Sequence, residues 1–158
     1  MDKSPADAER YAGIVKRSVG GIFLDKDSIR ITDDGCSALT VETFNYDAEV
    51  HYGGMVSQYA RQPYVDASYA VTACEFSFGK KAYRQLRFTV FGLDDKIIYS
   101  VKIHNSIWGS EDLDPMTLIL LDAVSKNLPE DTRQLLSDDV KSFEEHMQEK
   151  EDAKKKEE

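Results

Sequence analysis

The sequence predicts a single α+β domain in which an antiparallel β-meander is packed by C-terminal helices. Three successive short segments alternate apolar and polar residues with a period of two, which is typical of strands with one buried face. After Trp108 the apolar residues recur at intervals of three and four, as they do on one face of a helix. The 158 residues suffice for one domain with a modest core. We expect it to cover residues 1–148, with a poorly ordered start over residues 1–19 and a charged tail over residues 149–158.

The part of the chain before Asn45 contains weaker signals. Residues 6–15 are compatible with one or two helical turns. Two apolar segments, Ile22–Leu24 and Ile29–Ile31, predict either a strand pair or a single kinked strand. The segment 33–35, Asp-Asp-Gly, favours a hairpin turn, and the β-branched and aromatic residues of 38–44 favour a strand.

The meander is expected to consist of strands over Tyr69–Phe78, Tyr83–Phe91 and Ile97–Ile103. Strict alternation places Cys74, Phe76 and Phe78 on one face of the first strand. In the second strand it groups Leu86 with Phe88 and Val90 on one face, and Gln85 with Arg87 and Thr89 on the other. We therefore expect Phe76, Phe88 and Val101 to point to one buried face.

Two helices are expected to follow. The first covers Pro115–Leu128, with Asp114 as its cap and apolar residues at helical spacing, namely Leu118, Leu121 and Val124. The second begins at Pro129 and has one apolar stripe, formed by Leu136, Val140, Phe143 and Met147. From Glu149 onward the charged residues favour a frayed helix end or a disordered tail.

Charge and hydropathy narrow the range of partners. The formal net charge of -9 disfavours binding to nucleic acid or to anionic lipid, but it permits docking to a basic partner. No stretch reaches the roughly 18 apolar residues of a membrane-spanning helix. The polar segment Met1–Pro5 lacks the apolar region of a signal peptide, so the native protein is either cytosolic or processed by removal of a signal.

No motif for catalysis or metal binding is visible. The histidines His51, His104 and His146 do not stand at metal-ligand spacing with another histidine or with a cysteine. The sequence contains no nucleophile elbow, phosphate loop, dinucleotide fingerprint or zincin helix. We therefore expect a protein that is not an enzyme and that has no metal and no cofactor.

Four tyrosines in the irregular segment from Asn45 to Ala67 are candidate binding residues. They are Tyr46, Tyr52, Tyr59 and Tyr64. Exposed tyrosines offer a large amphipathic contact area and are common on binding surfaces. Local packing of the same four rings is the alternative.

The two cysteines, Cys36 and Cys74, form either one disulfide or two free thiols. Cys74 shares its expected strand face with Phe76 and should point inward. Cys36 follows the expected turn directly, at the start of the next strand. A bond requires the two α-carbons to lie within about 7 Å with the side chains facing each other.

The order of certain residues between Ile22 and Val124 carries a family resemblance. These residues are Phe23-Leu24-Asp25, Ser28-Ile29, Asp34-Gly35, Leu39-Thr40-Val41, Glu75-Phe76, Tyr83-Arg84, Leu86, Val90-Phe91, Asp94, Ile97-Ile98-Tyr99-Ser100 and Trp108. The pattern resembles the surface-adhesin protein E-like domains of the bacterial envelope. The resemblance implies a six-stranded antiparallel sheet with a helix, a location outside the cytoplasm and, in the named member, adhesion to host proteins.

The chain also departs from that family pattern. Phe78 stands where members often have a cysteine, and the expected closing helix lacks the partner cysteine. Gly109-Ser110 follows Trp108 without the usual proline, the helix from Pro129 is an addition, and a lipoprotein signal is absent. Residues that bind host proteins are not transferred, because no matching motif is present.

Two hypotheses for function follow. The first is a non-catalytic, envelope-associated or secreted domain, in the periplasm or at the cell surface, that binds another macromolecule. Its partner would be a host or envelope protein, in an adhesin-like role. The alternative is a cytosolic domain that binds a small apolar ligand between the sheet and the helices. The oligomeric state stays open.

Overall fold

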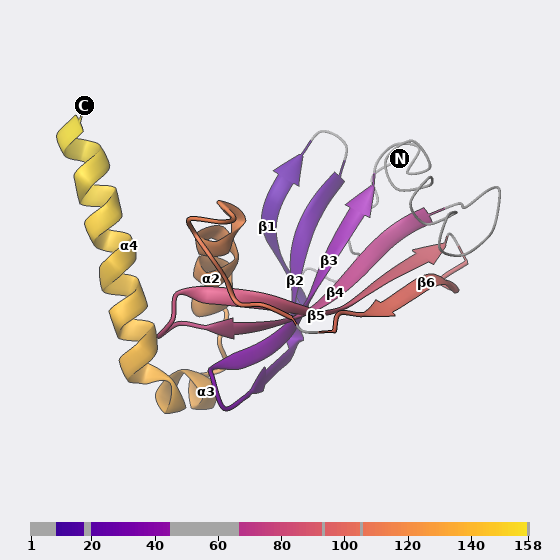
Figure 1. Ribbon diagram of the computed structural model, residues 1–158, viewed down its shortest axis with the longest axis horizontal. Helices are drawn as coiled ribbons and strands as arrows, with labels where there is room; N and C mark the ends of the chain where they lie inside the picture. Colours follow the sequence, from indigo (N-terminus) through magenta and orange to yellow (C-terminus); the bar gives the residue numbers. More distant parts are fainter. Residues whose placement is uncertain (1–8, 18–19, 45–66, 93, 105, 158) are drawn as a thin grey trace.

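The computed structural model describes residues 9–17, 20–44, 67–92, 94–104 and 106–157. These residues form one antiparallel sheet and three helices that follow it in the chain (Figure 1). Each of the first six strands pairs with the next one along the chain, in the order β1-β2-β3-β4-β5-β6. The α+β fold with an antiparallel meander and C-terminal helices, predicted from hydrophobic periodicity, is therefore confirmed.

The sheet elements have these bounds: β1 Tyr11–Arg17, β2 Gly20–Ile31, β3 Cys36–Phe44, β4 Ala67–Ser77, β5 Ala82–Gly92, β6 Ile97–Lys102 and β7 Gly109–Ser110. Strand β7 lies off the main order, because it pairs with the first residues of β5. The helices are α2 Met116–Lys126, α3 Glu130–Leu135 and α4 Ser137–Glu157.

The N-terminal part differs from the expectation. The helical turns considered for residues 6–15 and the poorly ordered start are wrong for Tyr11–Arg17, which form β1 at the edge of the sheet. The physical reason is long-range: β1 gains a backbone partner in β2, and this pairing outweighs a weak local preference for helix. Arg10 reinforces the pairing, because its Nε and Nη2 donate to the two carboxylate oxygens of buried Asp25 at 3.0 and 2.9 Å.

Strand β2 is a single irregular strand, which was one of the two alternatives for this segment. Its register against β3 shifts between Asp25 and Arg30. Ser28 stabilises this irregularity, because its Oγ donates to the Asp25 carbonyl oxygen at 2.6 Å and accepts the Leu39 amide at 2.8 Å. After β2 the expected turn is present, closed by backbone hydrogen bonds between Thr32 and Gly35.

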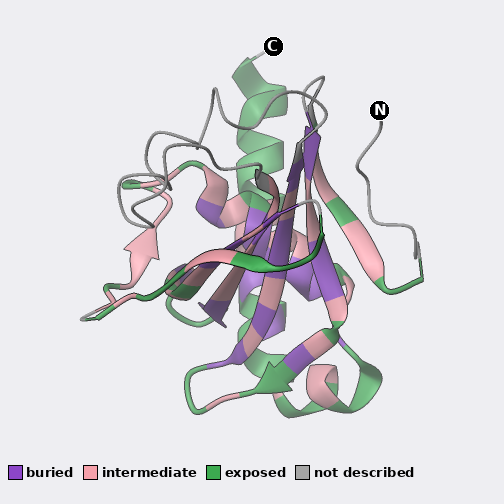
Figure 2. Cartoon of the chain, turned by 90° about the vertical axis from the view of Figure 1, so that its right-hand side faces the viewer, coloured by how far each residue is buried: buried purple, intermediate pink, exposed green. Residues whose placement is uncertain are grey.

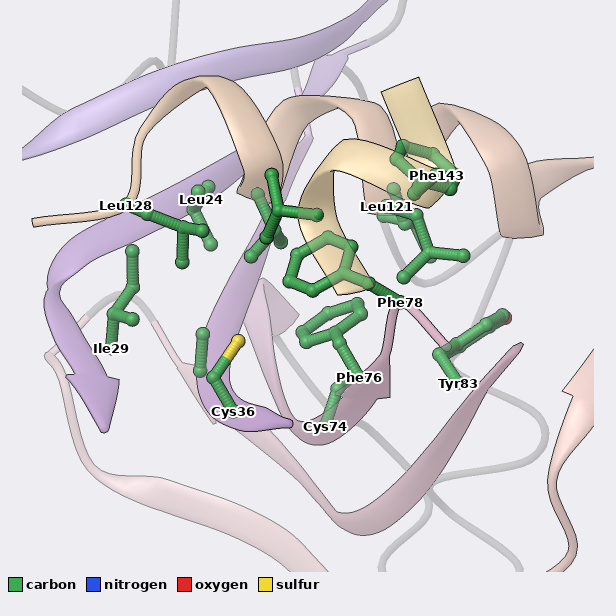
Figure 3. Packing of buried hydrophobic residues seen from close by; sticks show 14 residues of the cluster. Leu24, Ile29, Cys36, Cys74, Phe76, Phe78, Tyr83, Leu121, Leu128 and Phe143 are labelled. Atoms are coloured by element: carbon green, nitrogen blue, oxygen red, sulfur yellow. The ribbon is translucent and has the colours of Figure 1, made fainter. Parts of the chain in front are cut away.

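The core lies between one face of the sheet and the helices. Figure 3 shows Phe76, Phe78 and Tyr83 from the sheet side packed toward Leu121 and Phe143 from the helices. The centroids of the Phe78 and Phe143 rings are 5.6 Å apart. We call this face of the sheet the inner face, and the opposite one the outer face.

The apolar stripes are buried as the sequence predicted, but the single helix expected from Pro129 is divided at Leu136 into α3 and α4. In α2, Leu121 and Val124 are fully buried and Leu118 packs against the core. In α4, Val140 and Phe143 are buried, while Met147 is partly buried against the core. Beyond Met147 the side chains of α4 are exposed, and the charged tail is a continuation of this helix through Glu157 (Figure 2).

The helices cover only one part of the inner face. Strand register places Phe76, Phe88 and Val101 on this face, as expected, but their burial differs. Phe76 is fully buried, Phe88 is half-buried, and Val101 is 36% exposed. The expectation that all three are buried is wrong for Val101, because β6 is the last strand of the sheet order and Figure 1 shows the three helices at the opposite end of the sheet.

Within the part of the chain that the structure describes, no helix has the length and apolar character needed to cross a membrane.

Candidate functional site

A register shift between β4 and β5 determines which side chains share the outer face. Ala73 pairs with Arg87, but its neighbour Cys74 pairs with Gln85, so β5 contains one additional residue at Leu86. Gln85 and Arg87 therefore lie on opposite faces, and the expectation that they share a face is wrong. The shift also places Arg84 and Arg87 on the same outer face, which strict alternation would forbid for residues three apart.

Four residues form a compact cluster around the pair of Glu75 and Arg84 on the outer face, which we call the outer-face cluster. Arg84 donates from Nε and Nη2 to the same oxygen of Glu75, at 2.8 and 2.6 Å, and Glu75 is only 6% exposed. The guanidinium carbon lies 4.8 Å from the centroid of the Trp108 ring, and Lys80 Nζ lies 4.7 Å from the same centroid. Trp108 thus forms cation–π contacts with Arg84 and Lys80, and the Glu75 carboxylate compensates the charge of Arg84.

Next to this cluster, the edge of β5 that faces away from β4 pairs with two different strands in turn. Residues from Arg87 onward pair with β6, whereas Ala82 and Tyr83 pair with β7. Between the two, the Ile103 amide donates to the Leu86 carbonyl oxygen, and the Ser106 hydroxyl donates to the Gln85 carbonyl oxygen. The chain between β6 and β7 therefore leaves the sheet and returns to it.

A pocket of about 270 Å³ lies at this change of partner. One wall consists of Tyr83, Arg84 and Gln85 from β5. The other side is formed by residues of the segment between β6 and α2, including Ile103, Ile107 and Asp114. The volume lies below the usual range of about 300–1,000 Å³ for small-molecule sites, but it is sufficient for one large side chain.

A strong hydrogen bond anchors one wall of the pocket. The Tyr83 hydroxyl donates to Asp114 Oδ2 at 2.6 Å, and Asp114 Oδ1 accepts the Met116 amide at 2.9 Å. Asp114 therefore caps α2, as predicted, and also connects this helix to β5. Burial, and then the hydrogen bond to Asp114, raise the pKa of Tyr83, so the hydroxyl remains a donor at neutral pH.

Large apolar side chains are exposed in the same segment. Ile107, which lines the pocket, is 82% exposed, and Leu113 is 78% exposed. A rigid pocket beside an exposed apolar residue is typical of surfaces that anchor a partner side chain.

The segment after β7 is also tied to α4. Glu111 accepts a hydrogen bond from Lys150 Nζ at 2.6 Å, and its other oxygen lies 3.2 Å from His146 Nε2. The hydrogen bond from Lys150 is the largest cause of the lowered pKa of Glu111. These contacts hold the segment that forms the pocket against the last helix.

The residues selected from the sequence are not among those that line the described pocket. Tyr46, Tyr52, Tyr59 and Tyr64 are outside the described residues. His51 is outside them as well, and among the described histidines His146 is engaged by Glu111. No group of three potential metal ligands occurs within the described ranges.

Cys36 and Cys74 are free thiols on the inner face. Cys36 pairs with Phe76 and Cys74 pairs with Ala38, so the two cysteines lie diagonally on neighbouring strands rather than opposite each other. Diagonal positions are about 7–8 Å apart, which is at the limit for a disulfide. Burial raises the pKa of both thiols to about 12, so they are weak nucleophiles at neutral pH.

Sequence reasoning did not find the pocket. Its lining residues come from separate segments, and the register shift that arranges them has no local signal in the sequence. The only available hint was Trp108, which follows the last strand of the meander as a single aromatic residue in a polar segment.

Comparison of the chain with protein-family models, with curated proteins and with solved structures finds no match.

Proposed function

We propose that this protein is a non-catalytic domain that binds another protein, and that the pocket beside Ile107 receives a side chain of the partner. The observation that carries the proposal is the position of Ile107, which is 82% exposed at a preformed pocket of about 270 Å³. Burial of such a residue under a partner removes apolar surface from water, and the pocket supplies shape complementarity.

The rigidity of the pocket supports this role. Asp114 is bonded both to Tyr83 and to the first turn of α2, and Arg84 is held by Glu75 and Trp108. A preformed pocket loses little side-chain entropy when a partner binds. The two walls therefore favour binding without rearrangement.

The space between sheet and helices gives less support to the small-ligand alternative. Among the described residues this space is occupied by the side chains of Phe76, Phe78, Leu121 and Phe143, all of which are 1% exposed or less (Figure 3). Fully buried aromatic rings in contact fill a core rather than line a ligand cavity.

The family resemblance supports a location in the bacterial envelope or outside the cell. Its pattern includes Glu75, Arg84 and Trp108, which meet in the outer-face cluster. It also includes Ser28, which stabilises the irregularity of β2. We propose an adhesin-like role for the domain on this basis.

The experiment compares the wild-type domain with Ile107→Ser in pull-downs from envelope extract and from host matrix. Leu135→Ser is the matched control, because Leu135 is 72% exposed on α3 and does not line the pocket. We expect one partner to be retained by wild type and by Leu135→Ser and to be lost with Ile107→Ser. Equal recovery with all three proteins would reject the pocket as the binding surface.

A further inference from the structure

Two cations lie directly opposite each other on the outer face of the sheet. Arg87 on β5 pairs with Lys102 on β6, and both side chains are exposed on the outer face. Arg87 Nη1 donates to Ser100 Oγ at 3.2 Å, and Ser100 Oγ lies 2.9 Å from Thr89 Oγ1. The hydroxyls orient the guanidinium, but they do not compensate its charge.

This pair has no counter-charge within the part of the chain that the structure describes. Neither Arg87 nor Lys102 forms an ion pair there. Two acidic groups of the outer face, Asp25 in the same row and Glu75 in another row, are engaged by other arginines. Glu75 is bonded to Arg84, and Asp25 to Arg10. Like charges directly opposite each other on adjacent strands destabilise a sheet. A chain with 29 acidic and 20 basic residues thus retains an uncompensated cationic pair at this place.

The pair is close in the chain to pocket-lining residues on both strands, but neither cation lines the pocket. Ile103, which lines the pocket, follows Lys102 directly, and Gln85 of the pocket wall lies two residues before Arg87. Gln85 and Arg87 face opposite sides of the sheet, so the cationic pair is a surface feature separate from the pocket.

We propose that Arg87 and Lys102 bind a carboxylate on an acidic segment of the partner protein. The inference rests on the proposed function for the identity of the ligand, and it specifies the chemistry of the partner. A carboxylate offers two oxygens, which match the planar fork of the arginine and the point charge of the lysine. Two cations on a domain of net charge -9 provide too few phosphate contacts to hold a nucleic acid.

The test uses a fluorescein-labelled peptide that contains only glutamate, with a glutamine peptide of equal length as its neutral counterpart. We expect fluorescence anisotropy to show binding of the glutamate peptide alone, with an affinity that falls as salt is added. Arg87→Gln and Lys102→Gln should each weaken binding by about tenfold, which is the order expected for one charge-assisted contact. Lys96→Gln is the control, because Lys96 is exposed just before β6 and should not change the affinity.

A stability measurement separates loss of the site from loss of the fold. Lys102→Gln relieves the repulsion from Arg87, so its melting temperature should equal or exceed that of wild type. A lower melting temperature together with weaker binding would assign Lys102 a structural role and overturn the proposal.

Three other results would also overturn it: no binding by wild type, equal binding of the glutamine peptide, or unchanged affinity in both variants. Tighter binding of a single-stranded oligonucleotide that is lost in the same variants would assign the pair to nucleic acid instead. The glutamate peptide has no apolar residue for the pocket, so its binding is independent of Ile107. Failure of the Ile107→Ser experiment and failure of this one are therefore distinguishable.

Discussion

Glu75 and Arg84 face each other across β4 and β5, and Arg84 donates two hydrogen bonds to a single oxygen of the Glu75 carboxylate. The carboxylate is almost completely buried on the outer face, whereas the Arg84 side chain is 30% exposed. A charge buried in this way depends on its partner, because removal of one member leaves the other without compensation.

We expect Arg84→Leu to lower the free energy of unfolding by about 2–3 kcal/mol, somewhat below the range for a fully buried pair because Arg84 is partly solvated. Urea denaturation measures the difference. The double variant Glu75→Gln/Arg84→Leu should recover part of the loss, because no charge then remains buried. A single variant as stable as wild type would contradict this account.

The two phenylalanines on the inner face should differ in their contribution to stability. Phe76 is fully buried, so Phe76→Ala should cost about 3–5 kcal/mol. Phe88 is only half-buried, and Phe88→Ala should cost about half as much, because fewer of its contacts and less apolar area are lost. Thermal or urea unfolding of both variants would measure the two losses of stability. Equal losses would contradict the expectation that burial under the helices makes Phe76 contribute more than Phe88.

The two cysteines should be inert in the folded protein. Burial raises the pKa of Cys36 and Cys74 to about 12, which leaves almost no thiolate at neutral pH. We expect iodoacetamide to modify neither residue in the native state and both in urea, as mass spectrometry would detect. Rapid modification of either thiol in the native protein would contradict the placement of both in the core.

The raised pKa values of the two thiols should also make the stability of the protein depend on pH in the alkaline range. The folded protein holds the thiol protons more tightly than the unfolded chain, so this stabilisation is complete below about pH 9 and decreases as the pH rises toward 12. The free energy of unfolding should therefore fall more steeply above about pH 9 in wild type than in Cys36→Ala/Cys74→Ala. The slopes are compared, because the substitutions also change packing. Parallel curves would exclude a contribution from the thiols.

The charged residues after Lys150 should be dispensable for stability. The residues after it are exposed along α4, so truncation after Lys150 should leave the unfolding midpoint unchanged. Truncation after Glu149 also removes the hydrogen bond from Lys150 to Glu111 and should lower the midpoint slightly.

Acid should abolish the difference between the two truncations. Lys150 lowers the pKa of Glu111, so the stabilisation is present above the unfolded pKa of this carboxyl and is lost as the pH falls through the lowered one. Melting curves at neutral and at acidic pH measure the effect. A large fall in the unfolding midpoint on truncation after Lys150 would show instead that the residues after Lys150 pack against the rest of the protein.

The sequence by itself determined the elements with strong local periodicity. The strands of the meander, the apolar stripe of α4 and the capping role of Asp114 all depend on residues close together in the chain, and each is present in the structure. Periodicity also placed Cys74 and Phe76 correctly in the core, because alternation within an undistorted strand sets the face of each residue.

Only the tertiary structure decided the rest. Strand β1 forms because β2 lies beside it, and Val101 is exposed because the helices cover the other end of the sheet. The pocket and the outer-face pair of Arg87 and Lys102 depend on the register shift at Leu86 and on the position where the edge of β5 changes from β7 to β6. Register is a relation between strands, and a shift of one residue moves side chains to the opposite face without changing the pattern of either strand. The candidate site is therefore a product of strand pairing rather than of any local motif.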